Sequence, residues 1–212
     1  METIQGKKSF DIDFNEFTLR HKNYNRIILD LGTGDGKFTF HYAQIFPNHF
    51  VIGLDSCREN LHEYSRTKLP NLLYVIANAQ HLPCELHGLI SHIHINFPWG
   101  SLLQSLLNGD ANLFCGLEKI SSPNALINLH LNTGALNEQG WTLLNGVDQI
   151  QENLCRAGWQ IENPKEVNIQ ILKKFPSTWS KRIAFGRDPR AISLSGCFNL
   201  DSPLWEDCIL PI

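Results

Sequence analysis

The chain has 212 residues, of which 42% are hydrophobic and 18% charged, a composition typical of one globular domain with an ordinary apolar core. No apolar run approaches the roughly 18 residues of a membrane helix, and no signal peptide is recognisable, so we expect a cytoplasmic protein without a membrane anchor. The net charge of −3 argues weakly against nucleic-acid binding. The six cysteines lack any Cys-x-x-Cys pair, which predicts neither a zinc site nor a disulfide framework.

The first half of the chain alternates short apolar segments with helical ones. Two short strands with a turn near Gly6 are predicted over residues 1–12. Further strands are expected at 26–31, 49–54, 72–77, 92–96 and 125–131. Helices are expected at 37–45 and 59–67, where Pro47 and Pro70 stop them. This alternation predicts a parallel sheet with helices on both faces.

The second half has a different pattern. It predicts an amphipathic helix over 148–157, a strand over 159–168, a short helix around Ser180 and a last strand over 191–198. We therefore expect three parts along the chain. They are a hairpin extension over 1–25, an α/β domain over 26–199 and a C-terminal tail over 200–212.

A glycine-rich turn follows the strand at 26–31. Residues 30–36 read Asp-Leu-Gly-Thr-Gly-Asp-Gly, which is neither the dinucleotide pattern Gly-x-Gly-x-x-Gly nor a P-loop. A pyrophosphate prefers a helix N-terminus free of acids, but Asp30 and Asp35 flank this turn. Acids beside a closely approachable backbone favour a cationic ligand. S-adenosylmethionine carries a sulfonium and an ammonium group with which Asp30 could pair.

Two later strand ends complete the predicted cofactor site. Asp55, 19 residues after Gly36, can accept hydrogen bonds from both ribose hydroxyls, although a helix N-cap is the alternative. At the next strand end, Ala79 and Gln80 can offer a backbone N–H and a side-chain amide to adenine, or simply belong to a polar loop. The turn residues of this predicted cofactor site are Gly32, Thr33 and Gly34.

Two tryptophans mark the predicted substrate end. Trp99 follows Phe97 and Pro98 after the strand at 92–96, where a loop overhangs the ligand crevice of an open α/β sheet. Trp179 lies between Lys165 and Arg190, a segment with seven of the chain's 18 basic residues. The two rings could sandwich a purine taken out of its stack. A packed aromatic corner and a solvated basic face are the alternatives.

His92 and His94 stand on one face of a strand and could bind a metal. No acid or cysteine is obviously placed beside them. We therefore expect core or hydrogen-bonded histidines and no metal site.

Five segments together resemble the aminoglycoside-resistance 16S ribosomal RNA methyltransferases, which modify N1 of the decoding-site adenine 1408. The resemblance covers roughly residues 3–199. The two most specific segments read Phe-Pro-Trp-Gly and Trp-x-Lys-Arg-x-Ala-Phe-Gly-Arg. The five segments, in chain order, are 30–36, 58–61, 79–83, 97–103 and 179–187.

The resemblance implies a class I, Rossmann-like, S-adenosylmethionine-dependent methyltransferase whose seven-stranded sheet is mostly parallel with an antiparallel last pair. Ser101 would join the cofactor site. Trp99 and Trp179 would grip the flipped adenine, with Pro98, Phe97 and Ser177 shaping its pocket. The substrate would be 16S rRNA within the 30S ribosomal subunit, and we expect the enzyme to be a monomer. The basic residues placed near rRNA would be Lys181, Arg182, Arg187 and Arg190.

The chain also departs from the family pattern. Gln80 stands where the family usually has glutamate, and residues 66–70 are short where some relatives carry a lysine-rich insertion. Asp188 and Pro189 interrupt the basic run, and the segment over residues 132–145 is shorter than the family pattern. The tail from residue 200 to 212 has no recognised counterpart. These departures concern rRNA docking more than the cofactor site.

The chemistry expected of such an enzyme needs no general base. Adenine N1 already has an in-plane lone pair, so the enzyme's task is to place it in line with the methyl group, roughly 3 Å away. Two other functions remain open from the sequence. One is methylation of another RNA, such as tRNA at guanine N7, and the other is a homologue that binds cofactor or RNA with weak or no activity.

Overall fold

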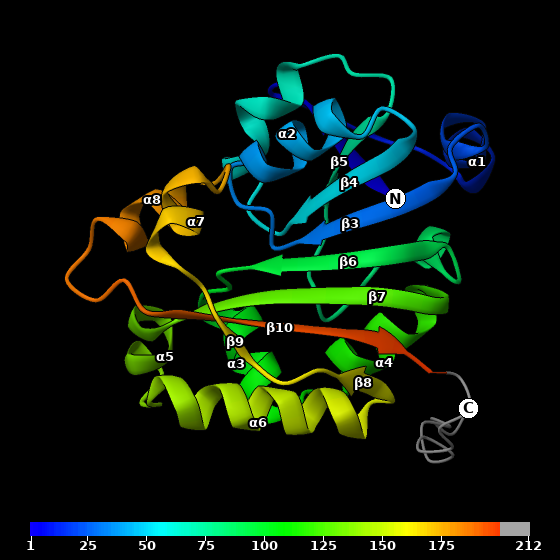
Figure 1. The fold of residues 1–212 in the computed structure, drawn as a ribbon. Helices are drawn as coiled ribbons and strands as arrows, with labels where there is room; N and C mark the ends of the chain where they lie inside the picture. The colour runs from blue at the N-terminus through cyan, green and yellow to red at the C-terminus, as the bar shows by residue number, and fades with distance from the viewer. Residues whose placement is uncertain (200–212) are drawn as a thin grey trace.

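The computed structural model describes residues 1–199, which form one ten-stranded sheet with helices on both faces (Figure 1). The strand order is β2-β1-β5-β4-β3-β6-β7-β10-β8, and β9 pairs with β10. Five neighbouring strands are parallel, as the sequence predicts. They are β3 (Arg26–Leu31), β4 (His49–Asp55), β5 (Leu72–Ile76), β6 (Ile90–Asn96) and β7 (Ser121–Asn132). The predicted tail over 200–212 lies outside the described residues.

The last strands run antiparallel to the others. β10 (Ala191–Phe198) pairs with β7 on one side and with β8 (Trp159–Ile161) and β9 (Lys165–Glu166) on the other. The prediction of one strand over 159–168 is therefore wrong. Pro164 lies in the gap between the two short strands and cannot donate a backbone hydrogen bond to a sheet.

The predicted N-terminal hairpin is confirmed, and it extends the sheet. β1 (Glu2–Gln5) pairs antiparallel with β2 (Lys8–Asp11) on one side and with β5 on the other, so β2 is the edge strand. Gly6 turns the hairpin with a φ of 62°, a left-handed conformation that glycine adopts readily. The seven-stranded sheet from β5 to β8 is thereby widened at one edge by the hairpin and by β9 at the other.

Alternation along the strands separates two packing faces. In β3, Leu29 and Leu31 belong to the main core with α1, α3, α4 and α6, whereas Ile28 packs with Ala43 of α2 on the opposite face.

The sequence pattern did not predict α1, α3, α4, α5 or α7. The bounds are α1 Phe14–His21, α2 Lys37–Ile45, α3 Gly100–Asn108, α4 Ala111–Ile120, α5 Thr133–Glu138, α6 Leu143–Arg156, α7 Ile169–Lys174 and α8 Thr178–Ala184.

Two helix predictions need correction. The segment 59–67 is not an α-helix but two 3₁₀ turns, η1 (Asn60–His62) and η2 (Tyr64–Arg66). Leu61 of η1 and Tyr64 of η2 both pack in the cluster that also holds Ile4 of β1. Helix α6 begins five residues earlier than predicted, because the Thr142 hydroxyl accepts a hydrogen bond from the Asn145 N–H.

The carboxyl ends of the parallel strands meet at one edge of the sheet, beside α7 and α8 (Figure 1). A short 3₁₀ turn, η3 (Cys84–Leu86), lies between β5 and β6. Within residues 1–199, no helix has both the length and the apolar character to cross a membrane.

Candidate functional site

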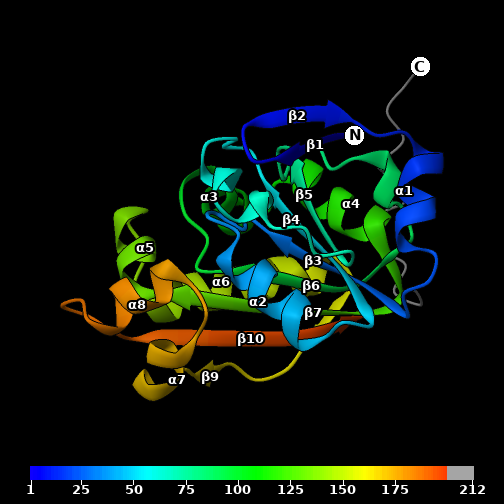
Figure 2. The ribbon, with the colours of Figure 1, turned by 90° about the horizontal axis from the view of Figure 1, so that it is seen from above.

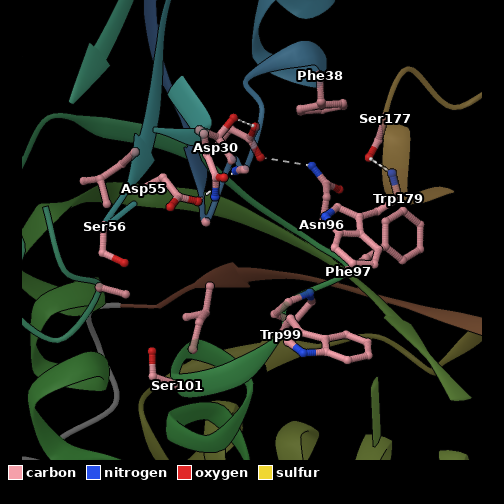
Figure 3. Close-up of a pocket in the computed structure, with 18 of the residues that line it drawn as sticks. Asp30, Phe38, Asp55, Ser56, Asn96, Phe97, Trp99, Ser101, Ser177 and Trp179 are labelled. Atoms are coloured by element: carbon pink, nitrogen blue, oxygen red, sulfur yellow. Dashed lines mark hydrogen bonds between the residues drawn. The ribbon is translucent and has the colours of Figure 1, made fainter. Parts of the chain in front are cut away.

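A cavity of about 400 Å³ opens at the carboxyl ends of β3, β4 and β6 (Figure 3). Its volume falls within the range of small-molecule sites, about 300–1,000 Å³. The structure thus brings together most of the residues that the sequence singled out for cofactor and adenine. Those that line the cavity are Asp30, Gly32, Thr33, Gly34, Asp55, Ala79, Phe97, Pro98, Trp99, Ser101, Ser177 and Trp179.

Asp30 lies at the floor of this cavity and is only 1% exposed. Its Oδ2 accepts hydrogen bonds from the hydroxyls of Thr33 and Thr39, the latter at 2.7 Å, and its Oδ1 accepts one from Asn96 Nδ2 at 3.1 Å. Burial raises the pKa of Asp30 to about 6, although these hydrogen bonds oppose the rise. With a pKa close to neutral pH, the ionised form of this buried carboxylate would be stabilised by a neighbouring cation.

The glycine-rich turn has the geometry of a close-approach site. Gly32, Gly34 and Gly36 all have φ between 59° and 79°, which disfavours any side chain. A Cβ on Gly34 would meet no atom within 4 Å, so open space borders the turn at this point. The Gly34 N–H donates to Asp55 Oδ2 at 2.8 Å, which joins the first two strand ends.

Asp55 is therefore not a helix N-cap. Its second oxygen accepts from the Cys57 N–H at 2.8 Å, in a turn two residues long, and no α-helix follows. Burial raises the pKa of this carboxyl as well. Asp30 is thus fully buried and Asp55 partly buried, and each carboxylate accepts hydrogen bonds from several donors.

The structure places Gln80 outside the cavity. Its Nε2 donates to Ser105 Oγ and to Asp110 Oδ2, both at 3.0 Å, so the amide faces α3 and the start of α4. Ala79 and Asn78 do line the cavity. The predicted adenine contact of Gln80 would require its side chain to leave two hydrogen bonds. That contact stays a prediction, with the structure pointing to Ala79 and Asn78 instead.

Trp99 and Trp179 face each other across the mouth of the cavity (Figure 3). Their ring centroids are 5.6 Å apart, the rings are inclined by 18°, and each side chain is 43% exposed. A base stacked on both rings needs two van der Waals spacings, or about 7 Å in total. The rings must therefore part by a little over one ångström to admit a base between them.

Local structure holds both tryptophans in place. Phe97 has a φ of 53°, a strained value for a non-glycine residue, and its N–H donates to His130 O at 2.8 Å. This kink directs Trp99 over the cavity while Phe97 itself is buried in a side cluster. On the other side, the Thr178 hydroxyl donates to Asp35 Oδ2 at 2.6 Å. Trp179 is thereby tied to the glycine-rich turn.

Sequence reasoning missed several contributors to the site. Asn96 bridges Asp30 to His130, whose Nδ1 lies 2.9 Å from Asn96 Oδ1. Phe38 lines the cavity from α2 and stacks on Phe175 at 5.3 Å. Asn96 could have been found as the polar residue ending its strand, a usual position for ligand contacts. No comparable sequence signal marks Phe38 or its stacking partner Phe175 as part of the site.

The histidines of the fourth and fifth parallel strands pack among aromatic rings. His92 and His94 stack at 4.1 Å, and His92 Nε2 contacts Asn128 Oδ1. Burial lowers the pKa of His94, and it lowers that of His130 to about 4, so both are neutral at physiological pH. Among the described residues, no three His, Cys, Asp or Glu side chains gather as metal ligands.

The basic residues of the second half differ in their availability. Arg182 lies over the Trp179 ring, 4.9 Å from its centroid. Arg190 forms a bidentate pair with Asp188, with Nε 2.9 Å from Oδ1, and the pKa of Asp188 is lowered to about 2. Arg187 makes no ion pair within residues 1–199. The positive charge of Arg190 is therefore largely compensated, and that of Arg187 is not.

The cavity suits S-adenosylmethionine by its own chemistry. No lysine or arginine is among its lining residues, which disfavours a pyrophosphate ligand. Asp30 and Asp55 supply two carboxylates, one for a cationic group and one for paired hydroxyls. Gly34 leaves its main chain open to close approach.

Comparison with known proteins gives one consistent result. A sequence model of the NpmA family, described as 16S rRNA (adenine(1408)-N(1))-methyltransferase, matches residues 2–198. The chain is 30% identical to an Escherichia coli protein of that description, over 92% of this chain and 98% of the relative. The 16S rRNA methyltransferase KamB superposes with a TM-score of 0.84 at 28% identity, covering 94% and 100% of the two chains.

A tryptophan variant of the Catenulisporales acidiphilia 16S rRNA (adenine(1408)-N(1))-methyltransferase with cosubstrate SAM superposes with a TM-score of 0.83. Its 24% identity, over 96% of this chain and 99% of that one, supports the fold alone. The family model and the E. coli relative confirm the resemblance, and the two superposed structures confirm the class I fold. This chain belongs to the S-adenosylmethionine-dependent 16S rRNA (adenine(1408)-N(1))-methyltransferase family.

Proposed function

We propose that this protein methylates N1 of the 1408-type adenine in 16S rRNA assembled as the 30S subunit, and that this modification gives aminoglycoside resistance. One observation carries the assignment of substrate. Two half-exposed tryptophans, nearly parallel and 5.6 Å apart, stand at the mouth of an acidic cofactor cavity. Once the rings part by a little over one ångström, such a slot accepts a flat base brought out of its stack.

The cofactor-binding roles follow from position in the cavity. Asp30 pairs with the cationic groups of S-adenosylmethionine, and Asp55 accepts hydrogen bonds from the ribose hydroxyls through the lone pairs that Gly34 and Cys57 leave unused. Ala79 contacts adenine through its backbone, whereas Gln80 reaches the cofactor only if it leaves Ser105 and Asp110. The remaining members of the proposed cofactor site are Gly32, Thr33, Gly34 and Ser101.

Bound cofactor supplies an electrophilic methyl group, and the protein supplies placement. N1 of adenine has its lone pair in the ring plane, so no side chain has to remove a proton. The neutral His130 is not placed to act as a base, because it is buried, hydrogen-bonds to Asn96 and does not line the cavity. The faces of Trp99 and Trp179 can stabilise the positive charge that the base gains, by about 1–2 kcal/mol when desolvated.

The proposal also assigns rRNA contacts, the walls of the adenine slot and the state of the protein. Lys181, Arg182 and Arg187 contact rRNA phosphates, and Arg190 contributes less because it is paired with Asp188. Pro98, Phe97 and Ser177 shape the adenine slot. We expect a cytoplasmic monomer, in which residues 1–25 form an extension of the methyltransferase domain over 26–199.

The deciding experiment supplies tritiated S-adenosylmethionine together with 30S subunits, naked 16S rRNA or tRNA. We expect label in 30S subunits, and a reverse-transcription stop at the decoding-site adenine. Label in tRNA alone would replace this function with the tRNA alternative, and no label in any RNA would favour a binding protein without activity. Raised kanamycin or apramycin resistance in an expressing host would test the biological consequence.

Trp179→Ala tests the proposed slot. Loss of one stacking face costs about 1–3 kcal/mol, which corresponds to a roughly 5- to 150-fold slower methylation of 30S subunits with unchanged cofactor affinity. Phe14→Ala, which removes another exposed aromatic ring from α1, is the matched control and should leave the rate unchanged. Wild-type rates in Trp179→Ala would contradict the slot.

A further inference from the structure

A second concave surface lies between α2 and the α7–α8 pair, which are neighbours in both ribbon views (Figures 1 and 2). We call it the lysine groove, and its volume is about 430 Å³. No acidic residue is among those that line it. The lining residues are Lys37, His41, Ile45, Lys173, Lys174, Phe175, Pro176 and Lys181.

The four lysines of this groove form no ion pair with any residue from 1 to 199. The side-chain ion pairs of residues 1–199 occupy Arg20, Arg156, Lys165 and Arg190, and none of them involves a groove lysine. Lys173 makes a cation–π contact, with Nζ 5.4 Å from the Phe185 ring centroid. Four positive charges without an ion-pair partner in the described residues, gathered on one concave surface, create a local field that attracts a polyanion, despite the net charge of −3.

The lysine groove adjoins the cavity that holds the proposed adenine slot. Phe38 lines the cavity and Phe175 lines the groove, and their rings stack at 5.3 Å with an interplanar angle of 8°. This stack is a wall shared by both. Helix α8 presents Trp179 to the cavity and Lys181, two residues later, to the groove. A chain whose base enters the slot thus passes close to the lysines.

We propose that the lysine groove binds backbone phosphates of 16S rRNA next to the target adenine, with Lys37, Lys173 and Lys174 as phosphate contacts. The inference rests on the proposed function. Charge complementarity favours an RNA backbone, because ammonium groups on flexible stems neutralise phosphates without reading sequence. The groove also supplies basic surface to a chain that has only two charges at 66–70.

The test compares two triple variants of equal charge in the full-length protein. Lys37, Lys173 and Lys174 are changed to Ala in the first variant, and Lys8, Lys22 and Lys119, all exposed, are changed in the control. Binding to 30S subunits is measured at several salt concentrations, together with cofactor affinity and methylation rate. For the first variant we expect a 30S Kd weaker by about 10- to 100-fold and a log–log salt slope smaller by about three. The control should match wild type.

Each outcome bears on the groove separately from the proposed function. If wild type methylates 30S subunits and the groove variant keeps its affinity and salt slope, the groove inference is wrong while the function stands. Equal losses in both triple variants would also overturn it, since only net charge would then matter. If the triple variant loses cofactor binding, the Lys173→Ala/Lys174→Ala double variant on α7 repeats the test, with an expected slope change of about two. Lys→Arg at the same positions should restore affinity.

Discussion

Replacing Asp30 by asparagine is expected to make the folded protein more stable and the enzyme inactive. The carboxyl is buried at the cavity floor, where it accepts hydrogen bonds from two hydroxyls and from the Asn96 amide. Asparagine keeps the shape and one acceptor oxygen but carries no charge. The substitution therefore separates the cost of burying a charge from the packing of the site.

The magnitude follows from the pKa of Asp30. Burial raises it from 3.8 to about 6, so above pH 6 the ionised carboxyl costs the folded protein about 3 kcal/mol relative to the unfolded chain. Asp30→Asn removes this cost, but part of the resulting gain in stability is lost because the amide NH₂ of asparagine faces hydroxyl donors. We expect Asp30→Asn to raise the free energy of unfolding by about 1–3 kcal/mol at neutral pH.

The sign of the pH dependence is also fixed. Between pH 6 and about 4 the folded protein binds more protons than the unfolded chain at this residue, so the cost of Asp30 disappears as the pH falls. The stability advantage of the variant should therefore shrink across that window. Wild-type stability alone is not diagnostic, because His130, with its pKa lowered to about 4, destabilises the folded state in the same window. Taking the difference between the two proteins removes the His130 contribution.

Urea unfolding at about pH 7 and pH 4 measures the stability difference, and calorimetric titration measures cofactor affinity. The variant should lose measurable affinity for S-adenosylmethionine, and the wild-type affinity should fall about tenfold per pH unit below 6. Asp11→Asn, at an exposed position, should change neither quantity. An Asp30→Asn protein that is less stable than wild type at neutral pH, or that binds the cofactor normally, would refute the reasoning.

Three further substitutions probe the geometry of the site. Thr178→Val should slow methylation of 30S subunits up to about fivefold at unchanged cofactor affinity, since one hydrogen bond is lost, whereas Thr178→Ser should keep the wild-type rate. Gly36→Ala, whose Cβ would lie 2.5 Å from an aromatic ring, should lower the melting temperature more than Gly34→Ala, whose Cβ meets open space. Arg187→Ala should weaken 30S binding in a filter assay more than Arg190→Ala, because only Arg190 has a compensating carboxylate.

The amino-acid sequence by itself determined the parallel part of the sheet and most of the residues that line the cavity. Parallel strands read as continuous apolar runs, and each one places its last residues at the same edge of the sheet. Asp30, Asp55 and Trp99 each follow such a run, so a linear pattern was enough to bring them together. The strand over 159–168 and the helix over 59–67 were wrong because packing against β10 and β1 decided their form.

Only the tertiary structure decided which polar groups meet. Thr178 and Asp35 are 143 residues apart and bond at 2.6 Å, and Asn96 joins Asp30 to His130 across three strands. Gln80 turned away from the cavity because Ser105 and Asp110 lie within its reach. The lysine groove likewise gathers charges from α2, α7 and α8. Hydrogen bonds and charge clusters depend on distances in space, which no local period or spacing encodes.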